Sequence, residues 1–194
     1  MTEATQPPPR RRKVFGIGWA KTGTTTLGAC FKILGYDHQS QNLGLVPPLM
    51  RGDWTRVMQI AAAHESFEDW PWSVIYQELD RAFPGSRFVL TCREPGDWLE
   101  SYRAMLAREG SASEDMNRIR GWLYGLQFPD VSDHALLARF ERHRAEVLTY
   151  FAERPADLLV VDWAQGDGWS SLCRFLEAPV PPVPFPHLNR RPSS

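Results

Sequence analysis

The feature that most constrains the fold of this chain is a short apolar run that ends in glycine and leads into a turn rich in lysine and threonine. The run spans residues 13–18 and the turn spans residues 21–26. Beyond the turn, apolar side chains recur every three or four residues as far as Leu34, which predicts a helix from about Thr24 to Leu34. The pattern therefore predicts a strand, a tight loop and a helix.

A loop of this kind predicts an anion site. The first N–H groups of a helix have no intrahelical partners and lie at the positive end of its dipole, where a phosphate or sulfate can satisfy them. Lys21 adds a cation, and a threonine that only capped the helix would need one hydroxyl, not four. The expected anion-binding residues are Lys21, Thr22, Gly23, Thr24, Thr25 and Thr26. The common nucleotide-triphosphatase loop would require glycine at positions 15 and 20, where this chain has Phe15 and Ala20.

The rest of the chain alternates between apolar runs and amphipathic segments. Strands are expected from Tyr36, over 87–91 and over 158–162, and residues 39–48 are expected to be a loop. Helices are expected over 54–63, 71–83, from Pro95 onward, and over 114–128, 133–153 and 169–176, followed by an extended proline-rich arm over 179–186. This alternation predicts an α/β protein with a largely parallel sheet.

Composition limits the organisation and the partners. A chain of 194 residues with 43% hydrophobic residues predicts one domain, residues 13–194, after a disordered leader, residues 1–12. A net charge of −1 provides no overall attraction for nucleic acid or an anionic membrane, and no apolar run is long enough to span a bilayer. Three widely spaced cysteines suggest neither disulfides nor a zinc site, which fits a cytoplasmic protein. The oligomeric state stays open.

A second candidate anion site follows the strand predicted at 87–91. Arg93 comes directly after that strand and can direct two donors onto a phosphate, and Ser101 on the next helix can add a hydroxyl. Taken alone, Arg93 could equally pair with Glu94 or Asp97 at the surface, and Ser101 could face solvent.

These two motifs resemble those of one family. Residues 21–25 resemble the 5′-phosphosulfate loop of sulfotransferases that use 3′-phosphoadenosine 5′-phosphosulfate (PAPS), and Arg93 with Ser101 resembles their 3′-phosphate segment. Residues 83–91 and 185–191 are similar to a compact, bacterial-type branch of that superfamily. The resemblance implies a three-layer α/β/α, P-loop-type sulfotransferase fold, PAPS as donor and no metal. It also implies that Lys21 steadies the leaving oxygen and that Asn189, Arg190 and Arg191 close over the nucleotide, although these three residues could equally form a solvated basic tail.

Transfer to a hydroxyl often needs a base, and residues 64–72 concentrate the candidates. Asp69 is the first choice, although an aspartate two residues before Pro71 could instead cap a helix. His64 and Glu68 are the other candidates. His143 lies in a charged cluster, which is typical of a solvated helix face.

Two rival functions stay open. A small-molecule or nucleotide kinase would use Lys21 and Thr22 for a triphosphate and Asp162, at the end of an apolar run, to support magnesium. A non-catalytic nucleotide-binding module would keep the fold without the chemistry. The acceptor is expected to be a small molecule, and the tryptophans near the motifs, Trp19, Trp70 and Trp72, could either form aromatic walls for it or belong to the core.

Overall fold

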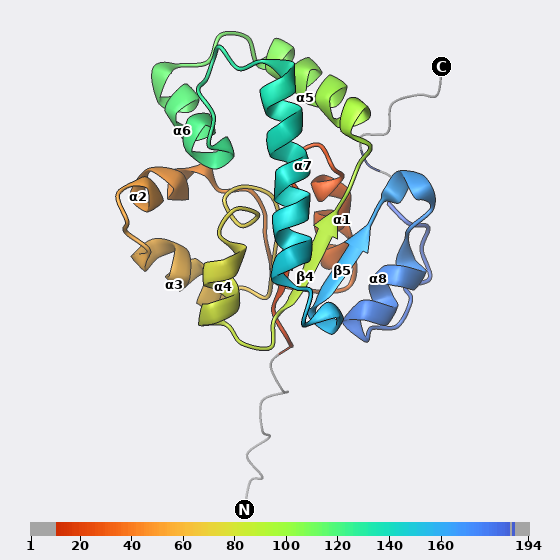
Figure 1. Ribbon diagram of the computed structural model, residues 1–194. Helices are drawn as coiled ribbons and strands as arrows, with labels where there is room; N and C mark the ends of the chain where they lie inside the picture. Colours follow the sequence, from red (N-terminus) through yellow and green to blue (C-terminus); the bar gives the residue numbers. More distant parts are fainter. Residues whose placement is uncertain (1–10, 187, 189–194) are drawn as a thin grey trace, which may run out of the picture.

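The computed structural model describes residues 11–186 and 188, and its centre is a five-stranded sheet in the order β2-β3-β1-β4-β5 (Figure 1). The strands are β1 (Val14–Gly16), β2 (His38–Gln39), β3 (Ser66–Phe67), β4 (Arg87–Thr91) and β5 (Leu158–Val161). Every neighbouring pair is parallel. All carboxyl ends therefore meet at one edge of the sheet, which is where ligand sites of open α/β sheets form.

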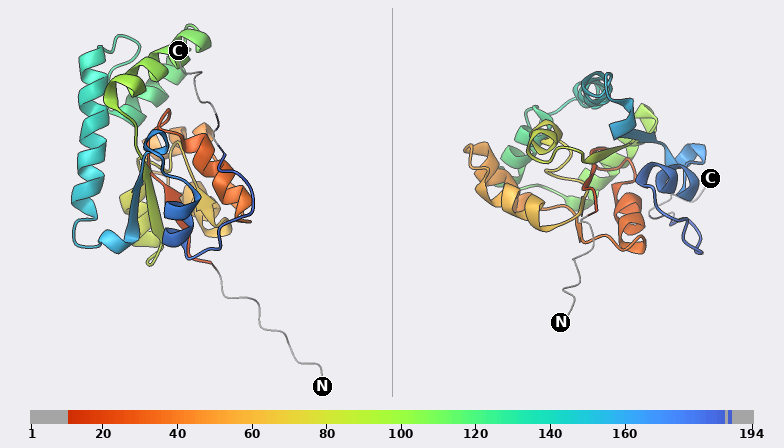
Figure 2. Two further views of the ribbon diagram at one scale, coloured as in Figure 1. Left: turned by 90° about the vertical axis from the view of Figure 1, so that its right-hand side faces the viewer. Right: turned by 90° about the horizontal axis from the view of Figure 1, so that it is seen from below.

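Alternation along the strands supplies one apolar surface on each side of the sheet. Phe15 and Phe88 face a core shared with α3 (Thr55–Ala63), α4 (Tyr76–Ala82) and α7 (Asp133–Tyr150). Val14 and Val89 face a second core shared with α1 (Thr24–Ile33) and α8 (Trp169–Leu176). Figure 2 shows α7 on one side of the sheet and α1 with α8 on the other. The predicted three-layer α/β/α fold with a parallel sheet is thus confirmed.

A third apolar cluster lies beyond the carboxyl edge. It joins α2 (Val46–Met50), α5 (Pro95–Glu109), α6 (Glu114–Tyr124) and the first turns of α7 around Trp19, Trp98 and Tyr124, all of which are buried. Trp98 stacks on Phe140 with ring centroids 4.2 Å apart. In Figure 1, α5 and α6 lie beyond the tips of the strands, so this cluster fixes the helices that overhang the sheet edge.

Several predicted boundaries were wrong. The segment expected as a loop over 39–48 contains a 3₁₀ helix, Leu43–Leu45, and the start of α2. The helix expected from Pro71 begins only at Tyr76, because turns closed by Val74 N–H to the Pro71 carbonyl (3.0 Å) and Ser73 N–H to the Asp69 carbonyl (3.2 Å) precede it. The strand β3 was missed, and α6 and α7 end earlier than expected, at Tyr124 and Tyr150. Two further 3₁₀ turns, Pro155–Asp157 and Trp163–Gln165, flank β5.

The two ends of the chain run against the body of the protein where they are described. Residues 1–10 of the predicted leader lie outside the described residues, whereas Arg11 donates to the Leu34 carbonyl at 2.9 Å. The arm after α8 has neither helix nor strand over 179–186, and the Trp169 indole donates to the Val183 carbonyl at 2.9 Å. Of the helices in the described part of the chain, none is both long and apolar enough to cross a membrane.

Candidate active site

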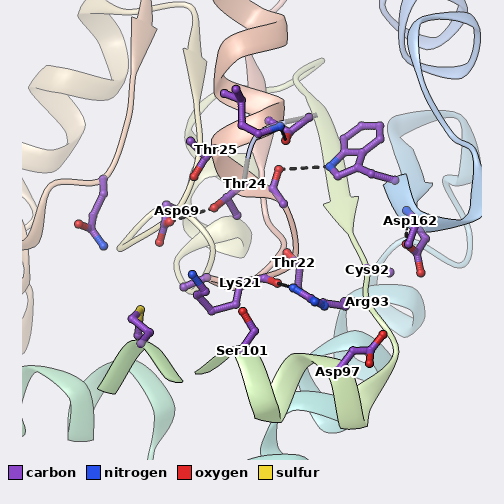
Figure 3. A pocket seen from close by; sticks show the side chains of 18 residues that line it. Lys21, Thr22, Thr24, Thr25, Asp69, Cys92, Arg93, Asp97, Ser101 and Asp162 are labelled. Carbon is purple, nitrogen blue, oxygen red and sulfur yellow. Dashed lines mark hydrogen bonds between the residues drawn. The ribbon is translucent and has the colours of Figure 1, made fainter. Parts of the chain in front are cut away.

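A cavity of about 500 Å³ opens at the carboxyl edge of the sheet. It lies where β1, β3, β4 and β5 end, and its walls come from the loops after these strands together with Gln41, residues of α5 and Leu188. We call it the edge cavity (Figure 3). Residues from both predicted motifs and from the base segment line this cavity, namely Lys21, Thr22, Gly23, Thr24, Thr25, Thr26, Asp69, Arg93 and Ser101. Asn189, Arg190 and Arg191 lie outside the described residues.

The loop between β1 and α1 has a backbone that few residues adopt. Gly23 occupies the N-cap position of α1 with φ 98°, and Lys21 has φ 74°. A Cβ at Gly23 would lie 2.3 Å from the Trp163 ring, whose Nε1 donates to the Gly23 carbonyl at 3.2 Å. Because glycine has no side chain with which to cap the helix, the first-turn N–H groups of α1 remain available to a ligand.

The threonine hydroxyls have different surroundings. The buried Thr22 hydroxyl donates to the Trp19 carbonyl (2.6 Å) and lies 2.6 Å from the Thr91 hydroxyl, so it holds the loop against β4. Thr24 donates to Asp69 Oδ2 at 3.0 Å. Thr26 accepts a hydrogen bond from the Leu188 N–H at 3.2 Å, and the exposed Thr25 lies on the cavity wall. Thr22 is therefore a structural residue of the loop more than a ligand donor.

The loop is also held by two helices. His143 on α7 is buried, donates from Nε2 to the Ile17 carbonyl at 2.8 Å and stacks on Trp19 with centroids 5.0 Å apart. Trp98 on α5 donates to the Ala20 carbonyl at 2.9 Å. The prediction that His143 lies on a solvated helix face was wrong, because its ring packs into the core beneath the loop.

Arg93 and Lys21 lie next to each other in the cavity. Arg93 Nη1 donates to the Lys21 carbonyl at 3.2 Å, and Glu94 caps α5 by accepting the Asp97 N–H at 2.9 Å. In Figure 3, the Lys21 side chain lies between Asp69 on one side and Arg93 on the other, with Ser101 beside it. The cavity therefore places two cations and a hydroxyl next to an uncapped helix end.

Burial lowers the pKa of Lys21 below its ordinary value, and the positive charges of Arg108 and Arg93 lower it further. This concentration of positive charge stabilises a bound anion. Arg108, near the end of α5, was missed from the sequence, because no local pattern distinguishes it from an ordinary basic residue in a last helical turn.

Asp69 is the only predicted base that lines the edge cavity. Burial and the nearby Glu68 carboxylate raise its pKa to about 6, although Trp70 N–H (2.8 Å), the Thr24 hydroxyl and Lys21 favour its charged form. Its backbone has φ 68°. The alternative that Asp69 caps a helix at Pro71 was wrong, since α4 begins at Tyr76.

The other two candidates lie elsewhere. Glu68 is buried on the other side of the strand end, where its carboxylate accepts a short hydrogen bond from Ser40 and lies 3.7 Å from His38 Nε2. His64 precedes β3, at the amino edge of the sheet, and its Nδ1 lies 2.9 Å from Asp37 Oδ1. Neither side chain lines the edge cavity.

Other wall residues had weak or no sequence signal, namely Gln41, Cys92, Asp97, Met105, Trp163 and Leu188. Asp162, the residue considered for magnesium, also lies on the wall, where it caps a 3₁₀ helix by accepting the Ala164 N–H at 2.9 Å. Within residues 11–186 and 188, no three His, Cys, Asp or Glu side chains are placed to share a metal ion.

Comparison with known proteins gives two findings. Residues 13–194 match the family described as "Sulfotransferase domain". The chain is also similar to "Ava biosynthesis cluster protein M" from Aspergillus versicolor, with 25% identity over 212 residues, which covers 91% of this chain and 80% of that protein.

Proposed function

Because the chain belongs to the sulfotransferase domain family, we propose that it transfers a sulfuryl group from PAPS to a hydroxyl, or an amine, of a small-molecule acceptor. The observation that best supports this proposal is that the β1–α1 loop and the Arg93–Ser101 segment line the same cavity. A donor with phosphate groups at both ends of its sugar needs two such sites, and the family match extends over both.

The residues present suit this donor. The N-cap position at Gly23 leaves backbone donors free, and Lys21 provides a charge for the 5′-phosphosulfate. Arg93 and Ser101 would hold the 3′-phosphate, since a guanidinium can make two charge-assisted hydrogen bonds to it. The donor supplies the activated sulfuryl group.

The chain's own residues then have separate tasks. Lys21 neutralises the charge that develops on the leaving phosphate oxygen, which is the usual largest contribution to such a transfer. Asp69, on the other side of Lys21 from Arg93, accepts the proton of the attacking hydroxyl. Arg93 and Ser101 fix the far end of the nucleotide, so that the reacting ends stay in register.

The kinase and the non-catalytic module are the competing proposals. A kinase would depend on magnesium and prefer ATP, and a chelator would abolish its activity. A non-catalytic module would bind nucleotide without turnover on any acceptor.

The test is calorimetric titration with 3′-phosphoadenosine 5′-phosphate, the desulfated product, in parallel with ATP, each with and without magnesium. We expect metal-independent binding of the bisphosphate.

Arg93→Ala should weaken bisphosphate binding by about 1.5–3 kcal/mol, as loss of a charge-assisted contact does. Arg56→Ala, at an exposed position on α3, is the matched control. Lys21→Ala should mainly lower kcat, by roughly 10²–10³-fold, with Lys32→Ala at an exposed position of α1 as its control. Magnesium-dependent preference for ATP would favour the kinase and contradict this proposal.

A further inference from the structure

A second cavity of about 390 Å³ adjoins the first. The walls of this side cavity include Leu43, Trp70, Tyr102, Met116, Leu123 and Tyr124, from the segment before α2, the segment after β3, and α5 and α6. Its volume lies within the roughly 300–1,000 Å³ typical of sites for small organic ligands.

The two cavities share part of their walls. Ala20, Gln41 and Met105 line both, and Asp69 in the edge cavity directly precedes Trp70 in the side cavity. A ligand in the side cavity can therefore present one end toward Asp69 and Lys21. The side cavity lies outside the sheet core and within the third apolar cluster.

The walls of the side cavity suit an uncharged aromatic body. The hydroxyl oxygens of Tyr102 and Tyr124 are buried, so these residues offer ring carbons to the cavity. The Trp70 ring lies edge-on to Tyr124 with centroids 5.0 Å apart, and the thioethers of Met105 and Met116 add polarizable contacts that favour aromatic rings. The charged wall residues, Glu109 and Arg120, form an ion pair with each other, so each charge already has an opposite charge beside it.

We propose that the side cavity binds the acceptor and that the acceptor is a phenol, with its ring among the side chains of α5 and α6 and its hydroxyl directed at Asp69. This inference rests on the proposed function. In the step, the phenol oxygen bonds to sulfur while the bond from sulfur to the bridging oxygen of PAPS breaks. The bisphosphate keeps the electron pair, and the phenol proton passes to the Asp69 carboxylate.

The acidity of the acceptor supports a phenol over an aliphatic alcohol. The pKa of Asp69 is about 6, and proton transfer becomes easier as the pKa of the donor approaches that of the base. The pKa of a phenol, about 10, is much closer to this value than the pKa of an aliphatic alcohol. A sugar would also meet mainly apolar side chains on these walls, where Gln41 and Ser113 are the polar residues besides the Glu109–Arg120 pair and the two tyrosines.

The test uses calorimetric titration of the whole protein with 2-naphthol, cyclohexanol and glucose. We expect 2-naphthol to bind at least about tenfold more tightly than cyclohexanol. We expect glucose not to bind. Met116→Trp and Ile119→Trp, at neighbouring wall positions of α6, should fill the cavity and weaken 2-naphthol binding about tenfold or more. Leu148→Trp, on the exposed face of α7, is the matched control.

The outcomes separate the two proposals. Bisphosphate binding should stay within about twofold in both α6 variants, and circular dichroism checks that they are folded. If the bisphosphate binds the wild-type protein but 2-naphthol does not, the phenol inference is overturned and the donor proposal stands. The same conclusion follows if the bisphosphate binds the wild-type protein and 2-naphthol binds both α6 variants as tightly as it binds the wild type. If 2-naphthol binding is lost in the variants but the bisphosphate does not bind wild-type protein, the donor proposal fails instead. Formation of 2-naphthyl sulfate from PAPS tests the complete reaction.

Discussion

At the residue scale, Asp69 combines features that are separately uncommon. Its backbone has φ 68°, its two carboxylate oxygens accept from the Trp70 N–H and the Thr24 hydroxyl, and its pKa is raised to about 6. An aspartate can adopt this backbone conformation more readily than most residues, and asparagine tolerates it equally. The site can therefore lose the carboxylate without losing the backbone.

We expect Asp69→Asn to lower kcat by roughly 10²–10⁴-fold, the usual contribution of a general base. In the wild type, the rate should fall as the pH falls through about 6, because the protonated carboxyl cannot accept a proton. A pH–rate profile measures both effects, with Asp97→Asn, an exposed carboxylate on the same cavity wall, as control. An unchanged acid limb in the asparagine variant would rule out Asp69 as the base.

The sequence made Asp69 the first choice for the base, with His64 and Glu68 as alternatives, and of these three residues the structure places Asp69 on the wall of the edge cavity. Glu68 and Asp69 are adjacent, yet their side chains diverge at the end of β3, one toward His38 and Ser40 and the other into the edge cavity. Choosing between them requires knowing that a strand ends at Phe67, and β3 is only two residues long. A strand of two residues is too short to show any alternation in the sequence. It is defined by its pairing with β1 and β2, which only the folded chain shows.

At the element scale, the strand–loop–helix unit was predictable because its signal is local. The apolar run before Gly18 forms β1, and the three- and four-residue spacing after Thr24 forms α1. Pro71 misled the prediction of α4, because Trp70 and Trp72 on either side of it are buried in different cores and hold a turn in place of a helix. Such tertiary constraints have no counterpart in local sequence.

Close contact between elements makes Gly18 a sensitive position. A Cβ there would lie 2.0 Å from Thr91 Oγ1 and 2.5 Å from the Thr91 carbonyl oxygen. We expect Gly18→Ala to displace the β1–α1 loop from β4, and thus to weaken bisphosphate binding by about tenfold or more and to lower the midpoint of thermal unfolding. Gly44→Ala is the control, because its Cβ would meet only the flexible Asn42 side chain, at 3.3 Å. Equal affinities in the two variants, measured by calorimetry, would contradict this account.

At the scale of the whole molecule, His143 links stability to pH. Burial, together with a smaller contribution from the charge of Arg139, lowers its pKa to about 4, although the hydrogen bond to the Ile17 carbonyl opposes the shift. Because the folded protein holds this imidazole neutral, its contribution to stability is present above the ordinary value of 6.5 and is lost as the pH falls toward 4. The raised pKa of Asp69 has the opposite effect on stability, because protonation of this carboxyl favours the folded state as the pH falls from about 6 to 3.8.

We expect the free energy of unfolding of the wild type to fall, relative to that of His143→Gln, by up to about 3 kcal/mol between pH 7 and pH 4. Glutamine can still donate to the Ile17 carbonyl but does not titrate. Urea unfolding at several pH values measures the difference, and His134→Gln, at an exposed position on the same helix, controls for the loss of an imidazole. A constant difference across this range would show that His143 is not the titrating group.

The arrangement of the three apolar clusters has an evolutionary consequence. The two clusters beside the sheet hold the strands, whereas the third, beyond the carboxyl edge, packs α5 and α6 against Trp19 and Ala20 of the β1–α1 loop. Mutations on the inner face of α6 can change the shape of the side cavity without altering any residue of the sheet. Under the proposed function, descendants of one ancestral gene can therefore change the acceptor at α6 while the parallel sheet that positions the proposed donor site stays unaltered.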